Sequence, residues 1–278
     1  MPLATKEEIQ ILEKTAQELR RDTLDLIYKT KSPHIGCSLS MIELLTALYF
    51  RILRINSESP RDENRDRFLL SKGHGVPALY PFLAKKGFIK KEIFDGYAQD
   101  GGTLEQHPTR NIDLGIEITS GSLGHGLSIG SGMALAGKHD KKDYRVFVYL
   151  GDGELQEGSN WEAAMFASHH KLDNLVAIID HNKLQAMQRI EEVLDLNPLA
   201  DKWRAFGWET KEVNGHDLNE IVSVMNKIPF KKGKPSCVIA HTVKGKGISF
   251  MENEPRWHDR CPDENEYQQA LNELKGLC

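Results

Sequence analysis

The feature that most constrains the fold is a pair of apolar runs that each end at a short polar motif. The run 145–150 stops at the Gly-Asp-Gly motif 151–153, and the run 175–179 stops at the Asp-His-Asn motif 180–182. Between them, the Ser-x-x-Glu sequence at 159–162 has the spacing of a capping box and opens an Ala-rich segment. The pattern predicts a strand, a loop, a helix and a second strand, which together form one parallel crossover unit.

Two oxygen-bearing side chains, Asp152 and Asn182, follow these strands. In open α/β sheets, ligands bind outside the carboxyl ends of the strands. Carboxylate and amide oxygens suit Mg²⁺ or Ca²⁺, and Mg²⁺ usually keeps some water and bridges to phosphate. The flanking Gly151 and Gly153 allow a sharp turn and a close approach of backbone to ligand. We therefore expect a divalent cation, Mg²⁺ or Ca²⁺, at this edge of the sheet.

Strand and helix patterns alternate along the rest of the chain. Further strands are predicted at 67–71, 208–214 and 236–242, and helices at 5–30, 40–53, 76–86, 90–98, 197–206, 218–227 and 266–275. The continuation of the Gly-rich segment 121–132 through Met133 and Leu135 is also predicted to be helical. The helices that begin near 5 and 40 start with capping-box spacings, and 31–36 is predicted to be a loop. The predicted fold is α/β: one domain over 1–278, with a mostly parallel, doubly wound sheet of about five strands and helices on both faces.

Glycines inside the predicted helix that continues through Met133 and Leu135 carry a further implication. Each interior glycine costs about 1 kcal/mol relative to alanine, so the helix must gain something from their small size. We expect a ligand or another part of the backbone to approach this helix closely.

Charge and cysteine usage narrow the class of protein. A formal net charge of −4 gives no electrostatic reason to expect nucleic acid or an acidic membrane as a partner. The four cysteines have no Cys-x-x-Cys spacing and are interpreted as free thiols in a reducing compartment: Cys37, Cys237, Cys261 and Cys278. No apolar run approaches membrane-spanning length, and the first residues do not resemble a signal peptide. A cytoplasmic protein without a membrane or nucleic-acid partner is therefore expected.

A series of short motifs, in order along nearly the whole chain, resembles the transketolase family. The matching motifs lie at 31–36, 70–74, 107–108, 121–126, 151–158, 180–182 and 241–247. Within them, the Gly-Asp-Gly motif followed at this distance by Asn182 resembles the thiamine diphosphate signature. The resemblance implies the thiamine diphosphate-binding fold of the diphosphate-binding (PP) domain.

The resemblance also implies particular ligands for the cofactor. Mg²⁺ would be held by Asp152, Asn182 and the backbone carbonyl of Leu184, and the N–H of Gly153 would face the diphosphate. Further residues are implied to lie close to the cofactor: Gly121, Leu123, Gly124, Gly151, Glu157, Glu162, Lys244 and His74. The two glutamates are implied to lie near the interface with another chain. For Glu162 the capping box is an alternative role, and for Lys244 a solvated turn is an alternative.

Four histidines beside glycine or proline are candidates for proton transfer. By resemblance, His74 and His258 face the reacting oxygen of the substrate, while His34 and His107 contact its hydroxyls. A ketose hydroxyl must lose a proton as the carbon–carbon bond breaks, and imidazole titrates close enough to neutrality to take it up and return it. His125 lies where many relatives of the family carry glutamine. A hydrogen-bonding role and a packing role are equal alternatives for this side chain.

The resemblance implies that this chain is one part of an enzyme whose other domains lie on a second chain. In transketolases the glutamate that activates the cofactor and the groups that hold the sugar phosphate lie in other domains. We therefore expect a split transketolase, a heterotetramer in which a partner chain carries the pyrimidine-binding and C-terminal domains. Its expected reaction is transfer of a two-carbon ketol unit from a ketose phosphate to an aldose phosphate, with the pentose phosphate pathway as the default setting.

Two alternatives remain at this point. One is half of another thiamine diphosphate enzyme, such as deoxyxylulose-phosphate synthase or dihydroxyacetone synthase, although the motifs 154–158 and 161–163 favour transketolase. The other is a non-catalytic nucleotide- or cofactor-binding α/β module. Against nucleotide binding, the first strand–helix unit lacks Gly-x-Gly-x-x-Gly, and the chain lacks a phosphate-binding loop of the Gly-x-x-x-x-Gly-Lys-Ser/Thr type.

Overall fold

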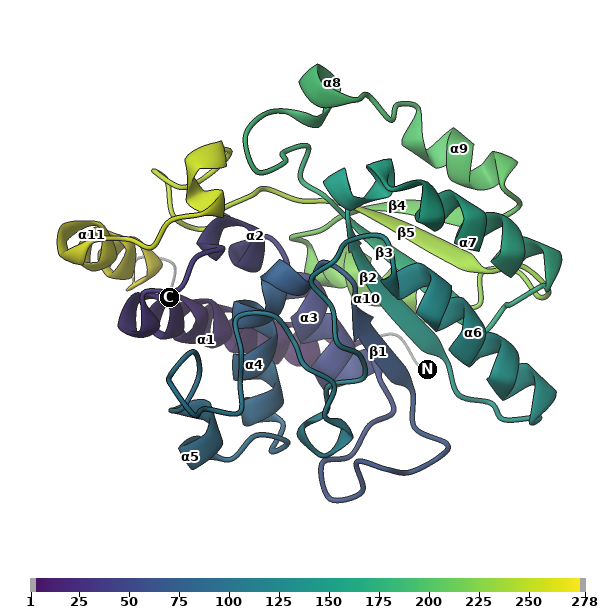
Figure 1. The fold of residues 1–278 in the computed structure, drawn as a ribbon, viewed down its shortest axis with the longest axis horizontal. Coiled ribbons are helices and arrows are strands. Elements are labelled where there is room, and N and C mark those ends of the chain that lie inside the picture. The colour runs from purple at the N-terminus through teal and green to yellow at the C-terminus, as the bar shows by residue number, and fades with distance from the viewer. Residues whose placement is uncertain (1–3, 276–278) are drawn as a thin grey trace.

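The computed structural model describes residues 4–275 and has a parallel sheet at its centre (Figure 1). Within these residues the sheet has five strands in the order β1-β2-β3-β5-β4, and every neighbouring pair is parallel. The strands are β1 (Arg67–Leu70), β2 (Val146–Gly151), β3 (Leu175–His181), β4 (Glu209–Asn214) and β5 (Ser236–His241). The predicted α/β fold with a parallel sheet of this size is confirmed.

Helices cover both faces of the sheet (Figure 1). One face packs against α1 (Lys6–Thr30), α3 (Ile42–Ala47), α4 (Val76–Lys85) and α10 (Leu218–Met225). The other face packs against α6 (Gly126–His139), α7 (Gly158–His169) and α9 (Leu199–Ala205). Side chains of β2 alternate between the two cores, since Phe147 and Tyr149 join the first and Val146 and Val148 the second. A strand buried on both faces explains the continuous apolar run in the sequence.

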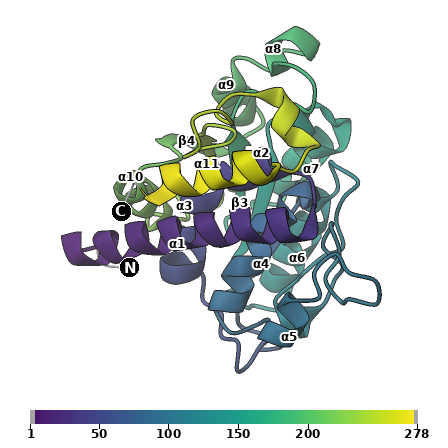
Figure 2. The same ribbon diagram turned by 90° about the vertical axis from the view of Figure 1, so that its left-hand side faces the viewer.

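Segments from the two ends of the chain lie side by side. The helix α11 (Glu264–Lys275) runs along α1, as Figure 2 shows. A third apolar cluster joins Leu24 and Ile27 of α1 to Ile35 and Leu39 of α2 (Ile35–Leu39) and to Trp257. This packing brings the segment around residue 258 against the segment around residue 34. The remaining short elements are η1 (Leu48–Ile52, a π-helical turn), η2 (Gly73–Gly75), α5 (Lys91–Phe94), η3 (Ile112–Leu114), η4 (Gly153–Gln156), α8 (Ile190–Val193) and η5 (Pro255–His258).

The structure confirms one predicted capping box and contradicts two. At the start of α1, the Thr5 hydroxyl accepts from the Glu8 N–H at 3.1 Å and the Glu8 carboxylate accepts from the Thr5 N–H at 2.8 Å. Ser40 does not cap, because its hydroxyl donates to Asp180 at 2.7 Å, and the single helix expected over 40–53 divides into α3 and η1. Ser159 does not cap either, because it donates to the Gly124 carbonyl at 2.8 Å.

Close packing explains the glycines of α6. A Cβ atom added at Gly130 would lie 2.5 Å from Val148 Cγ2 of β2, and one added at Gly126 would lie 2.3 Å from Ser71 Oγ. The groups that approach the helix are therefore side chains of the sheet and of the loop after β1. The loop predicted at 31–36 is shorter than expected, since α2 begins at Ile35.

Two expectations about the chain as a whole can be compared with the described residues. Among the described helices, none is both long enough and apolar enough to cross a membrane. Cys37, Cys237 and Cys261 are free thiols. Cys278 lies outside the described residues.

Candidate functional site

A cavity of about 200 Å³ lies at the carboxyl ends of β2 and β3. Its wall contains nine of the residues singled out from the sequence: His74, Leu123, Gly151, Asp152, Gly153, Asn182, Leu184, Lys244 and His258. The same wall contains five residues that were not singled out: Cys37, Lys72, Glu154, Gln185 and Ala186. A larger cavity of about 680 Å³ borders α1 and α10, but its buried cation Arg20 already pairs with Glu43 and donates to two backbone carbonyls.

The predicted cation ligands lie together in this wall. Asp152 is 3% exposed, and its oxygens accept from the Gly153 N–H at 2.9 Å and the Lys183 N–H at 2.5 Å. The Asn182 side-chain oxygen accepts from the Leu184 N–H at 3.0 Å. Burial raises the pKa of Asp152 and its hydrogen bonds oppose that shift. A buried carboxylate and an amide oxygen beside a cavity fit the donor set of a hard divalent cation such as Mg²⁺.

A buried ion pair that sequence reasoning missed supports this wall. Lys72 is 1% exposed, and its ammonium lies 2.6 Å from Asp180 Oδ2 and donates to the Cys37 carbonyl at 3.1 Å. Asp180 also accepts from the hydroxyls of Ser40 and Thr242. Burial by itself would raise the pKa of Asp180, but the Lys72 ammonium and these hydrogen bonds lower it. Lys72 directly follows the first predicted strand, so the strand-end rule applied to Asp152 could have found it.

A second missed residue, Glu154, connects three backbone segments. Its carboxylate is 2% exposed and accepts from the Gly124 N–H at 2.9 Å, the Gly151 N–H at 3.1 Å and the Ser71 hydroxyl. The carboxylate thereby joins the glycine-rich loop 121–126 to the ends of β1 and β2. The motif 151–158 contains Glu154, but no local pattern indicates that its partners lie in other segments.

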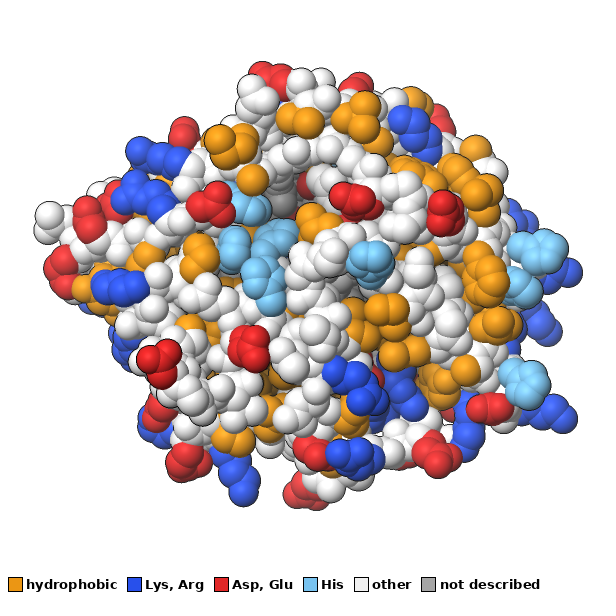
Figure 3. Space-filling view, viewed as in Figure 1, with side chains coloured by type: hydrophobic (Ala, Val, Ile, Leu, Met, Phe, Trp, Pro, Cys, Tyr) orange, Lys and Arg blue, Asp and Glu red, His pale blue; other side chains and the backbone are white. Residues whose placement is uncertain are grey.

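Four histidines converge beside the cavity, from four separate parts of the chain. The ring centroid of His34 lies 5.6 Å from that of His74, 5.8 Å from that of His107 and 5.3 Å from that of His258, and the rings of His74 and His258 are 5.2 Å apart. Figure 3 shows histidines gathered beside a hollow on this face. The sequence predicted these four residues, and the tertiary structure brings them together.

Burial keeps three of these imidazoles, those of His34, His74 and His258, neutral near pH 7. It lowers the pKa of His34 and of His258 to about 4, and it lowers the pKa of His74 as well. His34 has a left-handed backbone (φ 75°), and its N–H donates to the His258 carbonyl at 2.9 Å, so this contact helps to fix an otherwise unfavourable conformation. Lys244 is buried, donates to the Gln185 carbonyl at 2.8 Å and lies 3.3 Å from His258 Nδ1. Its alternative interpretation as a solvated lysine is therefore wrong.

The remaining candidates lie outside the cavity wall. Gly121 packs against the ring of His107, and Gly124 has a left-handed φ of 86° and lies against Glu157. Glu157 and Glu162 are exposed at the start of α7, and His125 is exposed at the start of α6. Neither glutamate closes a capping box. On the same helices, Ile129, Met165 and Phe166 are between 39% and 54% exposed, so large apolar side chains accompany the exposed carboxylates.

Comparison with known proteins identifies relatives over the length of the chain. Residues 11–275 match the family described as transketolase, thiamine diphosphate binding domain. The chain is 46% identical over 267 residues to one subunit of the apulose-4-phosphate transketolase of Phocaeicola vulgatus, and the match covers 96% of this chain and 95% of that protein. It is 43% identical over 264 residues to the 6-deoxy-6-sulfo-D-fructose transketolase subunit SqwG of Clostridium sp., with 95% and 96% covered.

Full-length transketolases are related over less than half of their length. Human transketolase is 36% identical over 270 residues, which are 97% of this chain and 43% of that protein. The structure of transketolase from Campylobacter jejuni superposes with a TM-score of 0.89 and 31% identity, over 96% of this chain and 43% of that chain. The extent of the family match, together with the fold and the relatives, shows that this chain belongs to the transketolase thiamine diphosphate-binding domain family.

Proposed function

We propose that this chain is the diphosphate-binding subunit of a two-chain transketolase. With a partner chain, it would transfer a two-carbon ketol unit from a ketose phosphate to an aldose phosphate, with thiamine diphosphate and Mg²⁺ as cofactors. The observation that most supports this is one cavity in which the oxygens of Asp152 and Asn182 meet the neutral imidazoles of His74 and His258. The relatives that match over almost their whole length are named as subunits of transketolases, which agrees with the proposal.

The proposal assigns the residues of the cavity wall to cofactor binding. Asp152, Asn182 and the Leu184 carbonyl would hold Mg²⁺, with Ca²⁺ as a possible substitute. The Gly153 N–H, which donates to Asp152 here, is a further donor near the expected diphosphate. Buried Lys244 adds positive charge to a site for an anionic group, whereas the charge of Lys72 is largely offset by Asp180. The Gln185 side-chain nitrogen in the same wall is buried without a hydrogen-bond partner, as expected where a ligand supplies an acceptor.

The histidines would handle the protons of the sugar. When bound, thiamine diphosphate supplies the carbon nucleophile and the electron sink for the two-carbon fragment. A neutral His74 or His258 can accept the proton of the hydroxyl whose carbon–carbon bond breaks, and can return it in the second half of the reaction. His34 and His107 would hydrogen-bond the neighbouring hydroxyls. The depressed pKa values of His34, His74 and His258 keep these three imidazoles available as acceptors at neutral pH.

The rest of the proposed enzyme lies on the partner. We propose that residues 1–278 form a single domain and that the pyrimidine-binding and C-terminal domains belong to the partner chain, in a heterotetramer. The exposed Glu157, Glu162 and apolar residues of α6 and α7 are candidates for the shared interface. Free thiols at Cys37, Cys237 and Cys261 agree with a cytoplasmic location.

Reconstitution tests the proposal directly. The chain is purified alone and together with the product of a neighbouring reading frame that contains a pyrimidine-domain glutamate, and ketol transfer is followed by a coupled assay. The donor panel includes pentose phosphate pathway ketoses and the sugars in the relatives' names, apulose 4-phosphate and 6-deoxy-6-sulfo-D-fructose. We expect transfer from the pair and none from the chain alone. Robust activity without a partner would refute the idea that the enzyme is divided between two chains.

A further inference from the structure

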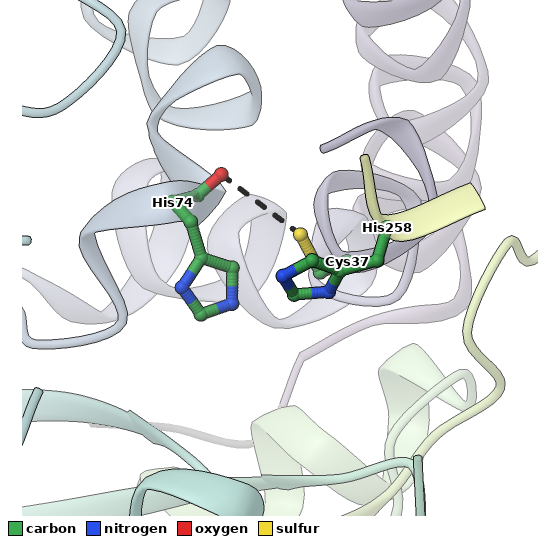
Figure 4. Close-up of side chains that lie close together, drawn as sticks. All are labelled: Cys37, His74 and His258. Atoms are coloured by element: carbon green, nitrogen blue, oxygen red, sulfur yellow. Dashed lines mark hydrogen bonds between the residues drawn. The ribbon is translucent and has the colours of Figure 1, made fainter. Parts of the chain in front are cut away.

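Three side chains in the cavity wall form a group that the proposed reaction does not require as a unit. One donor atom from each of Cys37, His74 and His258 can be chosen so that all three lie within 4.8 Å of one another. The residues come from α2, η2 and η5, and Figure 4 shows the sulfur and the two rings facing one space. Since none of the three is an expected ligand of Mg²⁺, the group is chemically distinct from Asp152 and Asn182.

The donor atoms are available for coordination. The Cys37 thiol is 3% exposed and donates to the His34 carbonyl at 3.2 Å and, over a longer distance of 3.9 Å, to the His74 carbonyl. Neutral imidazole is the form that binds metals, and burial disfavours the protonated form of His74 and of His258. His34 contributes a further buried nitrogen, Nδ1, that has no hydrogen-bond partner.

We propose that Cys37, His74 and His258 form a binding site for a soft divalent cation of the Zn²⁺ class. Zn²⁺ binds thiolate at about 2.3 Å and imidazole at about 2.0 Å, so its ligand atoms lie roughly 3.5 Å apart in a tetrahedron. The donor atoms now lie within 4.8 Å of one another, so they would have to approach one another to reach that spacing. Three protein ligands leave the fourth position to water. Mg²⁺ prefers oxygen ligands and does not compete for a site of this kind.

Nearby positive charge sets the strength of binding. The Lys244 ammonium lies 3.3 Å from His258 Nδ1 and therefore opposes a dication in this space. The charge of Lys72 is largely offset, because its ammonium is paired with Asp180. The thiol must lose its proton when the metal binds, so binding releases a proton and strengthens as pH rises. Removing the charge of Lys244 should therefore tighten binding, whereas removing the thiol should weaken it.

If the proposed function is correct, an ion bound at this site would also affect the reaction. If His74 and His258 handle the protons of the sugar, an ion held by them excludes the sugar and inhibits transfer. Chelation would then restore the activity. Binding of the ion to the free chain does not depend on that reaction, so the two ideas can fail separately.

Metal binding to the purified full-length chain, without an affinity tag or cofactor, tests the proposal. Zn²⁺ affinity is measured by competition with a chromophoric chelator, and Co²⁺ is used as a spectroscopic probe. We expect one ion per chain and a thiolate-to-cobalt charge-transfer band. Cys37→Ser should abolish the band and weaken Zn²⁺ binding at least about 100-fold, because even the loss of a residue that only supports a metal ligand costs about 10- to 100-fold.

Four further variants make the result specific. Cys261→Ser, a control for a free thiol elsewhere, and Asp152→Asn, which alters only the proposed Mg²⁺ site, should leave Zn²⁺ affinity within about twofold. Lys244→Met should increase the affinity. His74→Ala repeats the loss in case Cys37→Ser does not fold, and circular dichroism checks each variant. Equal Zn²⁺ affinity in the wild type and both ligand variants, or a cobalt spectrum without a thiolate band, would overturn the proposal.

Discussion

At the scale of single residues, the cavity is unusual for the charges that are buried around it. Asp152, Asp180, Lys72 and Lys244 are all between 0% and 3% exposed. Burying a charge is costly unless a partner or hydrogen bonds offset the lost hydration. Asp180 has Lys72 as its partner, whereas Asp152 accepts from backbone N–H groups and has the neighbouring His181 Nδ1 at 3.3 Å. Asp152 is thus the carboxylate with most to gain from an added cation.

This asymmetry gives a prediction for Asp152→Asn. The substitution keeps the size of the side chain but removes the charge that would hold Mg²⁺, so Mg²⁺-dependent binding of thiamine diphosphate to the assembled enzyme should weaken at least about 100-fold. Calorimetry measures the affinity. Asp201→Asn, at an exposed carboxylate in α9 that pairs with Arg204, is the matched control. Unchanged affinity in Asp152→Asn would contradict the metal assignment.

The buried histidines predict how stability depends on pH. The pKa of His34 and of His258 is about 4 in the folded chain, against an ordinary value of 6.5. Between these values the unfolded chain binds protons that the folded chain does not, so stability should fall as pH decreases from 6.5 towards 4. Thermal unfolding at a series of pH values measures this. His258→Gln should flatten the slope between pH 6.5 and 5, where carboxylates contribute little. Equal slopes in the wild type and in His258→Gln would contradict the prediction.

At the scale of secondary-structure elements, the site depends on how closely α6 approaches the sheet. The start of this helix is held by the Ser71 hydroxyl, which accepts from the Gly126 N–H at 3.1 Å. Glu154 holds the loop that precedes the helix. Further along, Gly130 lies directly against Val148 within β2, the strand that leads to Asp152. The start of α6 is therefore linked to the cavity wall through Ser71 and Glu154.

A matched pair of alanine substitutions tests this packing. Gly130→Ala places a methyl group 2.5 Å from Val148 Cγ2, and such overpacking should destabilise the chain by about 1–3 kcal/mol. Gly132→Ala adds a methyl group with nothing within 4 Å and should stabilise the helix by up to about 1 kcal/mol. Denaturant unfolding of the isolated chain measures both free energies. Similar effects from the two substitutions would show that α6 does not pack as described.

At the scale of the whole molecule, packing of the chain ends assembles the histidines. The segment 242–258 crosses from β5 to the start of α2, where the Gly245 N–H donates to the Gly36 carbonyl at 2.8 Å. The cluster that contains Trp257 anchors this segment on α1 and α2. These contacts place His258 beside His34, whose N–H donates to the His258 carbonyl. The completeness of the histidine group therefore depends on residues at both ends of the chain.

The exposed surface of α6 and α7 leads to a prediction about assembly. Exposed Met165 and Phe166 beside Glu157 and Glu162 give this surface the mixed apolar and polar character of a protein–protein interface. Native mass spectrometry of the co-purified pair should give a heterotetramer with two copies of each chain. Met165→Asp should shift the assembly towards smaller species without unfolding the isolated chain, because the side chain is 54% exposed. A one-to-one complex as the only species would contradict the prediction.

Several parts of this protein follow from the sequence by itself. Local apolar patterns locate the five strands, and the motifs that follow β2 and β3 predict that Asp152 and Asn182 meet, because parallel strands end at one edge of a sheet. The capping box of α1 is equally local, since both of its bonds join residues three apart. Information of this kind needs no knowledge of distant segments.

Other features are decided only by the tertiary structure. Ser40 and Ser159 have the spacing of helix caps, yet their hydroxyls bond to Asp180 and Gly124 in other segments. The Lys72–Asp180 pair and the thiol of Cys37 beside His74 and His258 likewise join residues far apart in the chain. A polar side chain forms a hydrogen bond with the partner that folding buries beside it. A hydrogen bond in the buried, low-dielectric interior is stronger than the exposed local bond that the sequence spacing suggests. Sequence spacing therefore identifies which residues can act, while packing determines which of them meet.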